Sequence, residues 1–143
     1  MVCKQIDSCS GLGIRFLPPI AVVVMATITG CGKSDDAQKM ATAKESTEAA
    51  MNAWKQEQPP PTTPAIVVNV GSTPVEFFDE DRQAGARLIE YQLLAVYIDP
   101  DQTARCSVEL NLQRTNGVTE KINVTYQVVL KDQKVVIARD PFS

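Results

Sequence analysis

The chain has 143 residues and a formal net charge of −3, with four cysteines and no histidine. This length suits one domain. The mild acidic excess argues against a nucleic-acid-binding protein, which needs a basic surface to displace counterions from phosphate. Without histidine, neither Ser-His-Asp nor Cys-His catalysis can be assembled within this chain, and the commonest metal ligand is missing. We therefore expect a protein that is not an enzyme and that uses no cofactor, no metal and no nucleic acid.

The first thirty residues have the pattern of an export signal. Lys4 and Arg15 supply positive charge, and an uncharged, mostly apolar stretch runs from Phe16 to Thr29. These 14 residues would span only about 21 Å as a helix, which is less than the ~30 Å hydrocarbon core of a bilayer. We interpret residues 1–30 as a signal peptide that is removed on export.

The segment ends in Ile28-Thr29-Gly30-Cys31, which resembles the lipobox of bacterial lipoproteins. Small residues let the extended backbone enter the signal peptidase, and the Cys31 thiol accepts diacylglycerol before cleavage. The resemblance implies lipidation at Cys31, with acyl chains such as palmitate. It also implies a protein anchored in the cell membrane or outer membrane, facing the periplasm or the exterior. The alternative is an uncleaved apolar anchor with an incidental cysteine. Since Cys3 and Cys9 would leave with the signal, only Cys106 would remain as a thiol.

Residues 31–58 are predicted to form a tether and an amphipathic helix, with the helix running from Asp35 to about Glu57. Its apolar and small side chains recur at spacings of three and four and form one stripe, which comprises Met40, Ala43, Thr47, Ala50, Met51 and Trp54. We expect Ser34 or Asp35 to cap the helix and Trp54 to fill a core rather than stack on a ligand. Residues 59–64 form a proline-rich connector, with recognition by a partner as the alternative role.

Residues 65–143 read as an antiparallel β domain. Strands are expected at Ala65–Val70, Leu88–Ile98, Arg105–Gln113, Lys121–Val128 and Val135–Ala138. The breaks between them are Gly71-Ser72-Thr73-Pro74, Asp99-Pro100-Asp101, the hairpin signal Asn116-Gly117, and Asp132-Gln133. The sequence leaves Phe77 to Asp81 ambiguous, with a helical turn as one possibility.

These patterns predict an α+β fold in which one N-terminal amphipathic helix packs on a curved antiparallel meander of about four strands. The last four strands form that meander, with one apolar and one polar face, and the helix covers the apolar face. The arrangement is similar to cystatin-like folds and to the sheet half of NTF2-like folds. A similarity of this kind concerns the fold and carries no function.

A second resemblance covers most of the expected mature chain. It rests on Ala53-Trp54-Lys55, Ala84-Gly85, Leu88, Tyr91, Val108-Glu109-Leu110, Tyr126-Gln127-Val128 and Arg139-Asp140. These residues resemble small uncharacterised lipoproteins of planctomycete-type bacteria, which pair an "AWK" helix with a "Gly…Leu…Tyr" strand and a terminal hairpin. Those proteins usually carry a tryptophan ahead of the glycine, where this chain has Arg82 and Gln83. The resemblance implies the fold and no activity.

Five groups of residues are candidates for chemical sites. Glu76, Asp79, Glu80 and Asp81 form the densest acidic cluster, but they lack a calcium-loop register, so we interpret them as a solvated loop. Asp99-Pro100-Asp101 has too few ligands for a metal. Cys106 lies on the inward face of a strand, where a buried, inert thiol is expected. The glycosylation sequon Asn123-Val124-Thr125 means little in a bacterium that uses a lipobox. Five scattered arginines can converge on an anionic ligand: Arg82, Arg87, Arg105, Arg114 and Arg139.

We therefore expect a membrane-anchored envelope lipoprotein whose domain is a non-catalytic binding or interaction module, with an envelope protein as a possible partner. The alternative is a small-ligand-binding domain that uses the concave face of the sheet. A carboxylate-based enzyme ranks third.

Overall fold

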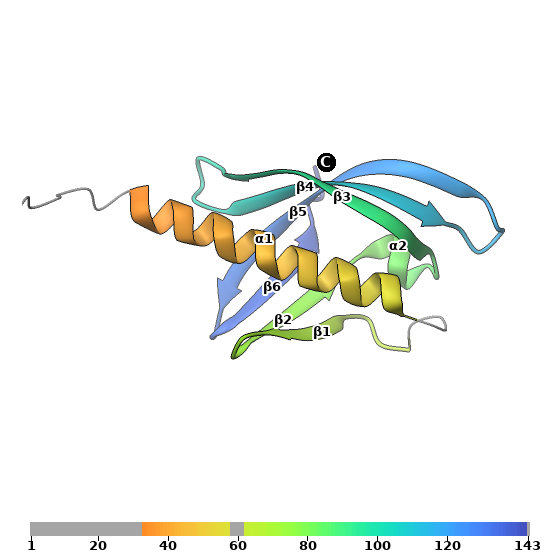
Figure 1. The fold of residues 1–143 in the computed structure, drawn as a ribbon, viewed down its shortest axis with the longest axis horizontal. Coiled ribbons are helices and arrows are strands. Elements are labelled where there is room, and N and C mark those ends of the chain that lie inside the picture. The colour runs from red at the N-terminus through yellow and green to blue at the C-terminus, as the bar shows by residue number, and fades with distance from the viewer. Residues whose placement is uncertain (1–32, 58–61, 143) are drawn as a thin grey trace, which may run out of the picture.

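The protein is an α+β fold in which one long helix packs against a curled six-stranded mixed sheet (Figure 1). This is a computed structural model, and it describes residues 33–57 and 62–142. The helices are α1 (Lys33–Gln56) and the one-turn α2 (Glu80–Gln83). The strands are β1 (Ile66–Val70), β2 (Thr73–Phe78), β3 (Arg87–Ile98), β4 (Ala104–Gln113), β5 (Thr119–Lys131) and β6 (Lys134–Arg139).

The strand order in the sheet is β1-β2-β6-β5-β4-β3. Strands β3 to β6 pair consecutively and antiparallel, so the predicted meander is confirmed. The predicted turns also occur, and at the β4–β5 turn Gly117 has a φ of +84°, which glycine adopts without steric cost. Register shifts in β3 indicate bulges near Leu88 and Leu93, and bulges of this kind bend a strand.

The sheet is larger than the predicted meander of about four antiparallel strands, because β1 and β2 extend it to six strands and make it mixed. β2 runs parallel to β6, with Val75 beside Val135 and Phe77 beside Ile137. The sequence pattern places Thr73-Pro74 in a break between strands, whereas in the structure these residues begin β2. Within β2, Val75 and Phe77 point to the core and are fully buried. Pro74 is tolerated near the start of the strand, where the pairing with β6 has not yet begun.

Helix α1 lies across the concave side of the curled sheet and contacts β1, β2, β3 and β4. The predicted stripe faces the sheet: Ala43, Thr47, Ala50, Met51 and Trp54 are buried, and Met40 is half-buried. The helix begins earlier than expected, at Lys33, so Ser34 and Asp35 lie inside it and do not cap it. Asp35 and Asp36 instead occupy the first turn, where negative charge is favourable beside the helix dipole.

Trp54 anchors the C-terminal half of α1 to the sheet, as predicted. Its indole is 2% exposed and donates a hydrogen bond to the carbonyl oxygen of Ala86 over 3.3 Å. Its ring centroid is 5.9 Å from that of Phe77, which is in turn 5.4 Å from that of Tyr126. The helix and the sheet therefore share one core.

The long axis of the molecule separates two ends. α1 begins at the end that carries the β3–β4 and β5–β6 turns, while α2 and the β4–β5 hairpin lie at the opposite end (Figure 1). Within residues 33–57 and 62–142, no helix has the length and apolar character needed to cross a bilayer. The predicted signal peptide, Cys31, Gln58 and residues 59–61 of the connector lie outside the described residues.

Candidate functional site

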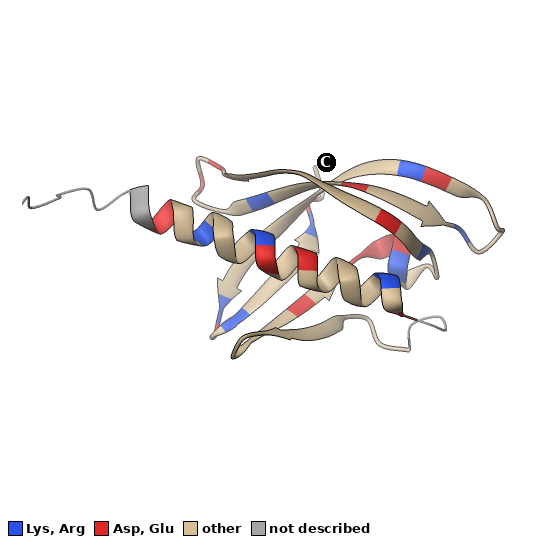
Figure 2. Cartoon of the chain, in the orientation of Figure 1, with Lys and Arg blue, Asp and Glu red and all other residues tan. Residues whose placement is uncertain are grey.

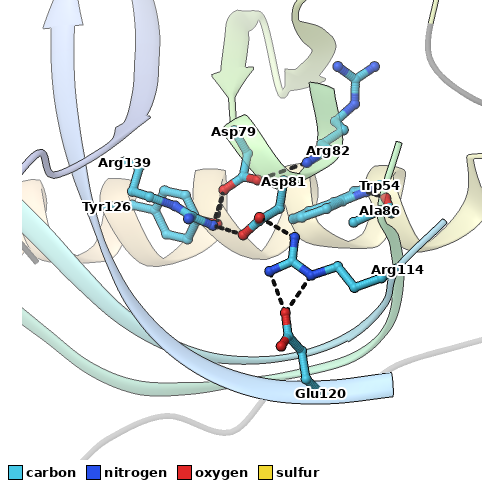
Figure 3. A network of polar contacts seen from close by, with 9 residues as sticks. All are labelled: Trp54, Asp79, Asp81, Arg82, Ala86, Arg114, Glu120, Tyr126 and Arg139. Carbon is cyan, nitrogen blue, oxygen red and sulfur yellow. Dashed lines mark hydrogen bonds and ion pairs between the residues drawn. The ribbon is translucent and has the colours of Figure 1, made fainter. Parts of the chain in front are cut away.

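The acidic cluster after β2 is not a solvated loop, so that interpretation was wrong. Asp79 is buried, Asp81 is half-buried, and Glu80 alone of the four is fully exposed. Glu76 lies on β2 and accepts two hydrogen bonds of 2.9 Å from Lys134 of β6. The side chains of two of the predicted arginines, Arg114 and Arg139, converge on this cluster, and Arg82 contributes its backbone N–H (Figure 3).

Asp79 is the centre of the network. It caps α2 by accepting a hydrogen bond from the backbone N–H of Arg82 over 3.0 Å. Its other oxygen accepts from the Tyr126 hydroxyl over 2.7 Å and from the Arg139 guanidinium over 2.9 Å. A buried carboxylate is tolerated when charged and neutral donors satisfy it in this way, so Asp79 joins β2, α2, β5 and β6.

Asp81 extends the network toward the β4–β5 hairpin. It accepts from Arg139 over 2.6 Å and also pairs with Arg114, which in turn pairs with Glu120 on β5. Burial alone would raise the pKa of Asp81, but the hydrogen bonds and charges of Arg114 and Arg139 outweigh it and hold that pKa below its usual range. The two arginines therefore favour the ionised form of this carboxylate.

Arg82 connects α2 to the end of α1 and to the connector. The side chain is 1% exposed and makes a bidentate pair with Glu57, with bonds of 2.8 and 2.6 Å. Its remaining nitrogen donates to the backbone carbonyls of Thr63 and Pro64 over 3.0 and 3.3 Å. One arginine thus holds the C-terminal end of the helix, the connector and α2 together.

The chemistry of this network is structural. Burial, followed by the nearby charge of Asp79, raises the pKa of Tyr126 well above its usual value, so the phenol stays protonated as a donor. Burial would lower the pKa of Arg139, but Asp79 and Asp81 raise it instead, which keeps the cation charged. Within the described parts of the chain, no group of histidine, cysteine, aspartate and glutamate side chains has the geometry to hold a metal ion.

A smaller ion-pair group surrounds Arg105 on β4. Its guanidinium pairs with Asp99, Asp101 and Asp140, which come from the β3–β4 turn and the end of β6. The Asp99-Pro100-Asp101 segment is a turn, as predicted, and its carboxylates serve this arginine. Arg87, the last of the five predicted arginines, is exposed.

Cys106 is buried on the inward face of β4, as predicted. Its sulfur accepts a hydrogen bond of 3.4 Å from the Thr47 hydroxyl of α1. Burial raises the pKa of the Cys106 thiol more than this bond lowers it, so the group is unreactive in the folded state. The Asn123 and Thr125 side chains lie on the opposite, outward face of β5 and are at least partly exposed.

The other end of the molecule carries a hollow that sequence reasoning missed. A groove of about 440 Å³ lies between the first three turns of α1 and the β5–β6 hairpin. Helix residues Asp35, Gln38, Lys39, Thr42 and Ala43 line one side, and residues 102–104, Val128, Val129, Leu130 and Val135 line the rest. The sequence carried one signal, because the alternation of β5 ends in the apolar run Val128-Val129-Leu130.

Charges of both signs are distributed along α1 and over the strands (Figure 2). The chain matches no family model, no curated protein and no solved structure. Its function must therefore be inferred from the residues and their arrangement.

Proposed function

We propose that the protein is a lipid-anchored, non-catalytic interaction module of the cell envelope, attached to a membrane through Cys31. The observation that carries the proposal is the sequence Ile28-Thr29-Gly30-Cys31 at the end of an apolar, positively flanked segment. The resemblance to small planctomycete-type lipoproteins supports the same class of protein. The likeness to cystatin-like and NTF2-like folds remains an expectation about the fold.

The structure supports a binding role over a catalytic one. In the densest acidic cluster, which was the candidate for carboxylate chemistry, Asp79 and Asp81 are held by Arg114, Arg139, Tyr126 and the backbone N–H of Arg82, and Glu76 pairs with Lys134. Groups held in mutual ion pairs inside a core stabilise the fold and are not available to a substrate. The groove beside α1 favours the second candidate, a site for a small apolar ligand, because its volume falls within the ~300–1,000 Å³ of typical ligand pockets. Over the rest of the concave face, α1 occupies the space that such a ligand would need.

The test is expression of the full chain in a bacterium fed an alkyne-bearing fatty acid. We expect the membrane-extracted protein to lack residues 1–30, to carry the label, and to show a diacylglyceryl-sized mass addition at Cys31. The Cys31→Ser variant should be unlabelled and should keep its N-terminus. Cys106→Ser is the matched control, because this thiol is buried and should not affect labelling. An intact N-terminus without lipid in the wild-type protein would overturn the proposal.

A further inference from the structure

The geometry points to a specific orientation on the membrane. We propose that the end of the domain where α1 begins is a lipid-contacting surface, defined by Val129 and Leu130 of β5 and by the groove beside them. This inference rests on the proposed lipidation of Cys31 and adds to it a second contact between protein and bilayer. The occupant is a lipid surface, met by apolar side chains in the interfacial region.

The length of chain between the lipid and the fold places this end near the bilayer. Cys31 precedes the first residue of α1, Lys33, by two positions, and two extended residues reach at most about 7 Å. α1 is not a free stalk, because Ala43 and the residues that follow along its stripe are buried against the sheet. A lipid on Cys31 would therefore hold this end at the membrane surface, at a high effective concentration of lipid.

Two large apolar side chains are exposed at this end, directly before the polar turn of the β5–β6 hairpin. Leu130 is 70% exposed on the inner face of β5, whose earlier inward residues are buried, and its neighbour Val129 is 44% exposed on the outer face. Leu130 pairs with Val135 across the hairpin, and both line the groove with Val128. The groove separates these side chains from the first turns of α1, so the helix leaves Leu130 uncovered. The end of the β5–β6 hairpin therefore exposes one apolar side chain on each of its faces, and the one on the inner face adjoins the groove.

The charges around the patch suit a contact driven by apolar burial. Lys39 lines the groove and Lys131 follows Leu130, and the long stems of lysines can lie along an apolar surface while their charges stay in water. Asp35 and Asp132 offset these two charges locally. We therefore expect the contact to form on zwitterionic lipid, with little dependence on anionic lipid. Leucine and valine enter the headgroup boundary at a depth of about 5–10 Å in such contacts.

This orientation fixes what the protein presents to its surroundings. The opposite end, with α2 and the β4–β5 hairpin, then projects away from the bilayer (Figure 1). A partner in the envelope would meet the hairpin tip and the outer face of the sheet first.

The experiment places a reporter at each end of the full, processed lipoprotein. Leu130→Cys and the matched variant Val118→Cys, which is 55% exposed on the β4–β5 hairpin, are labelled with an environment-sensitive fluorophore. Cys106 is buried, and mass spectrometry first verifies that the Cys31 thiol carries lipid. Each protein is reconstituted into phosphatidylcholine vesicles that contain a nitroxide-labelled phospholipid. We expect a blue shift and loss of most of the emission at position 130, and emission at position 118 that responds only to an aqueous quencher.

The outcomes separate the two proposals. Lipid on Cys31 with equal aqueous access at both positions overturns the orientation and leaves the proposed function standing. Quenching by lipid at both positions also overturns it, because the domain would then lie flat. A blue shift at position 130 without vesicles that grows with protein concentration would assign the patch to a second copy of the chain instead. Absence of lipid on the wild-type Cys31 overturns both proposals.

Discussion

The two ends of the molecule differ in how their side chains are partnered. At the end with α2, Asp79, Asp81, Arg82 and Arg139 are buried or half-buried and pair with one another or with adjoining strands. At the end where α1 begins, Val129 and Leu130 are exposed beside an open groove. The same helix therefore runs from an end where it is tightly fixed to an end where it is only partly covered.

This difference indicates that residues at the end with α2 stabilise the fold, whereas exposed residues at the other end are available for contacts. Trp54 and Arg82 hold the C-terminal half of α1 through packing, a hydrogen bond and a bidentate ion pair, so substitutions there should destabilise the whole domain. Val129 and Leu130, at the other end, are exposed and contribute little to the core, so they can contact a surface.

Trp54→Ala should lower the free energy of unfolding by about 3–5 kcal/mol, a large share of the ~5–15 kcal/mol typical of a domain. The loss follows from a cavity beside Phe77 and from the unpaired carbonyl of Ala86. Urea denaturation followed by circular dichroism measures it. Lys55→Ala, at the exposed neighbouring position, is the control and should change stability little. A loss for Trp54→Ala no larger than that of the control would show that α1 is not part of the folding unit.

Asp79→Ala should cost about 3–5 kcal/mol, because it leaves Arg139 with one fewer carboxylate and removes the cap of α2. Tyr126→Phe should cost about 1.5–3 kcal/mol, the range for a hydrogen bond to a charged group. The double variant should be less destabilised than the sum, since both changes remove one shared contact. Glu80→Ala, beside Asp79 but exposed, should stay near wild type. Strict additivity of the two changes would contradict the network.

Acid should lower the free energy of unfolding through Asp81, which lies at the end of the molecule with α2. Its pKa is lower in the folded protein than in the unfolded chain, where it is near 3.8, so the unfolded state binds more protons as the pH falls. The stabilisation from Asp81 is complete above that value and is lost as the pH falls through the lower folded pKa. Stability measured in urea from pH 6 to pH 2 should therefore fall less steeply in Asp81→Asn than in the wild type. Asp132→Asn, in an exposed turn, should keep the wild-type slope; an unchanged slope in Asp81→Asn would contradict the prediction.

Leu130→Asp should have the smallest effect on the free energy of unfolding, within about 0.5 kcal/mol, because the side chain is 70% exposed. Val118→Asp, at the opposite end, should change it by a similar amount. Thermal denaturation of both variants, free of membranes, makes the comparison. If Leu130→Asp alone lowered the free energy of unfolding by more than about 1 kcal/mol, Leu130 would belong to the core and would not be available for a surface contact.

Much of the fold could be predicted from local patterns. The alternation of Cys106, Val108, Leu110 and Leu112 with polar residues identified β4 and its inward face, because the side chains of a strand alternate between two environments. The stripe that ends at Trp54 identified α1 and its buried face in the same way. The turns at Asn116-Gly117 and Asp132-Gln133 were predictable because glycine and aspartate tolerate the positive φ angles that the structure shows at Gly117 and Asp132.

β2 was missed although it carries a local signal. Val75 and Phe77 alternate with Glu76 and Phe78, but the adjacent Pro74 and the pair of phenylalanines obscured the period. Its parallel pairing with β6 has no local signal at all, because the paired residues lie about sixty positions apart. The same pairing decides the site: it brings Asp79, at the end of β2, to Arg139, at the end of β6.

The sequence by itself determined most of the elements, the faces they bury and the lipobox-like segment from which an anchor at Cys31 is proposed, since each depends on residues that are close along the chain. Only the tertiary structure decided which arginine meets which carboxylate, and that Leu130 is left uncovered beside α1. Ion pairs and grooves depend on the register between distant strands and on where a helix crosses a sheet. Those relations are fixed by packing of the whole core, and no spacing along the chain records them.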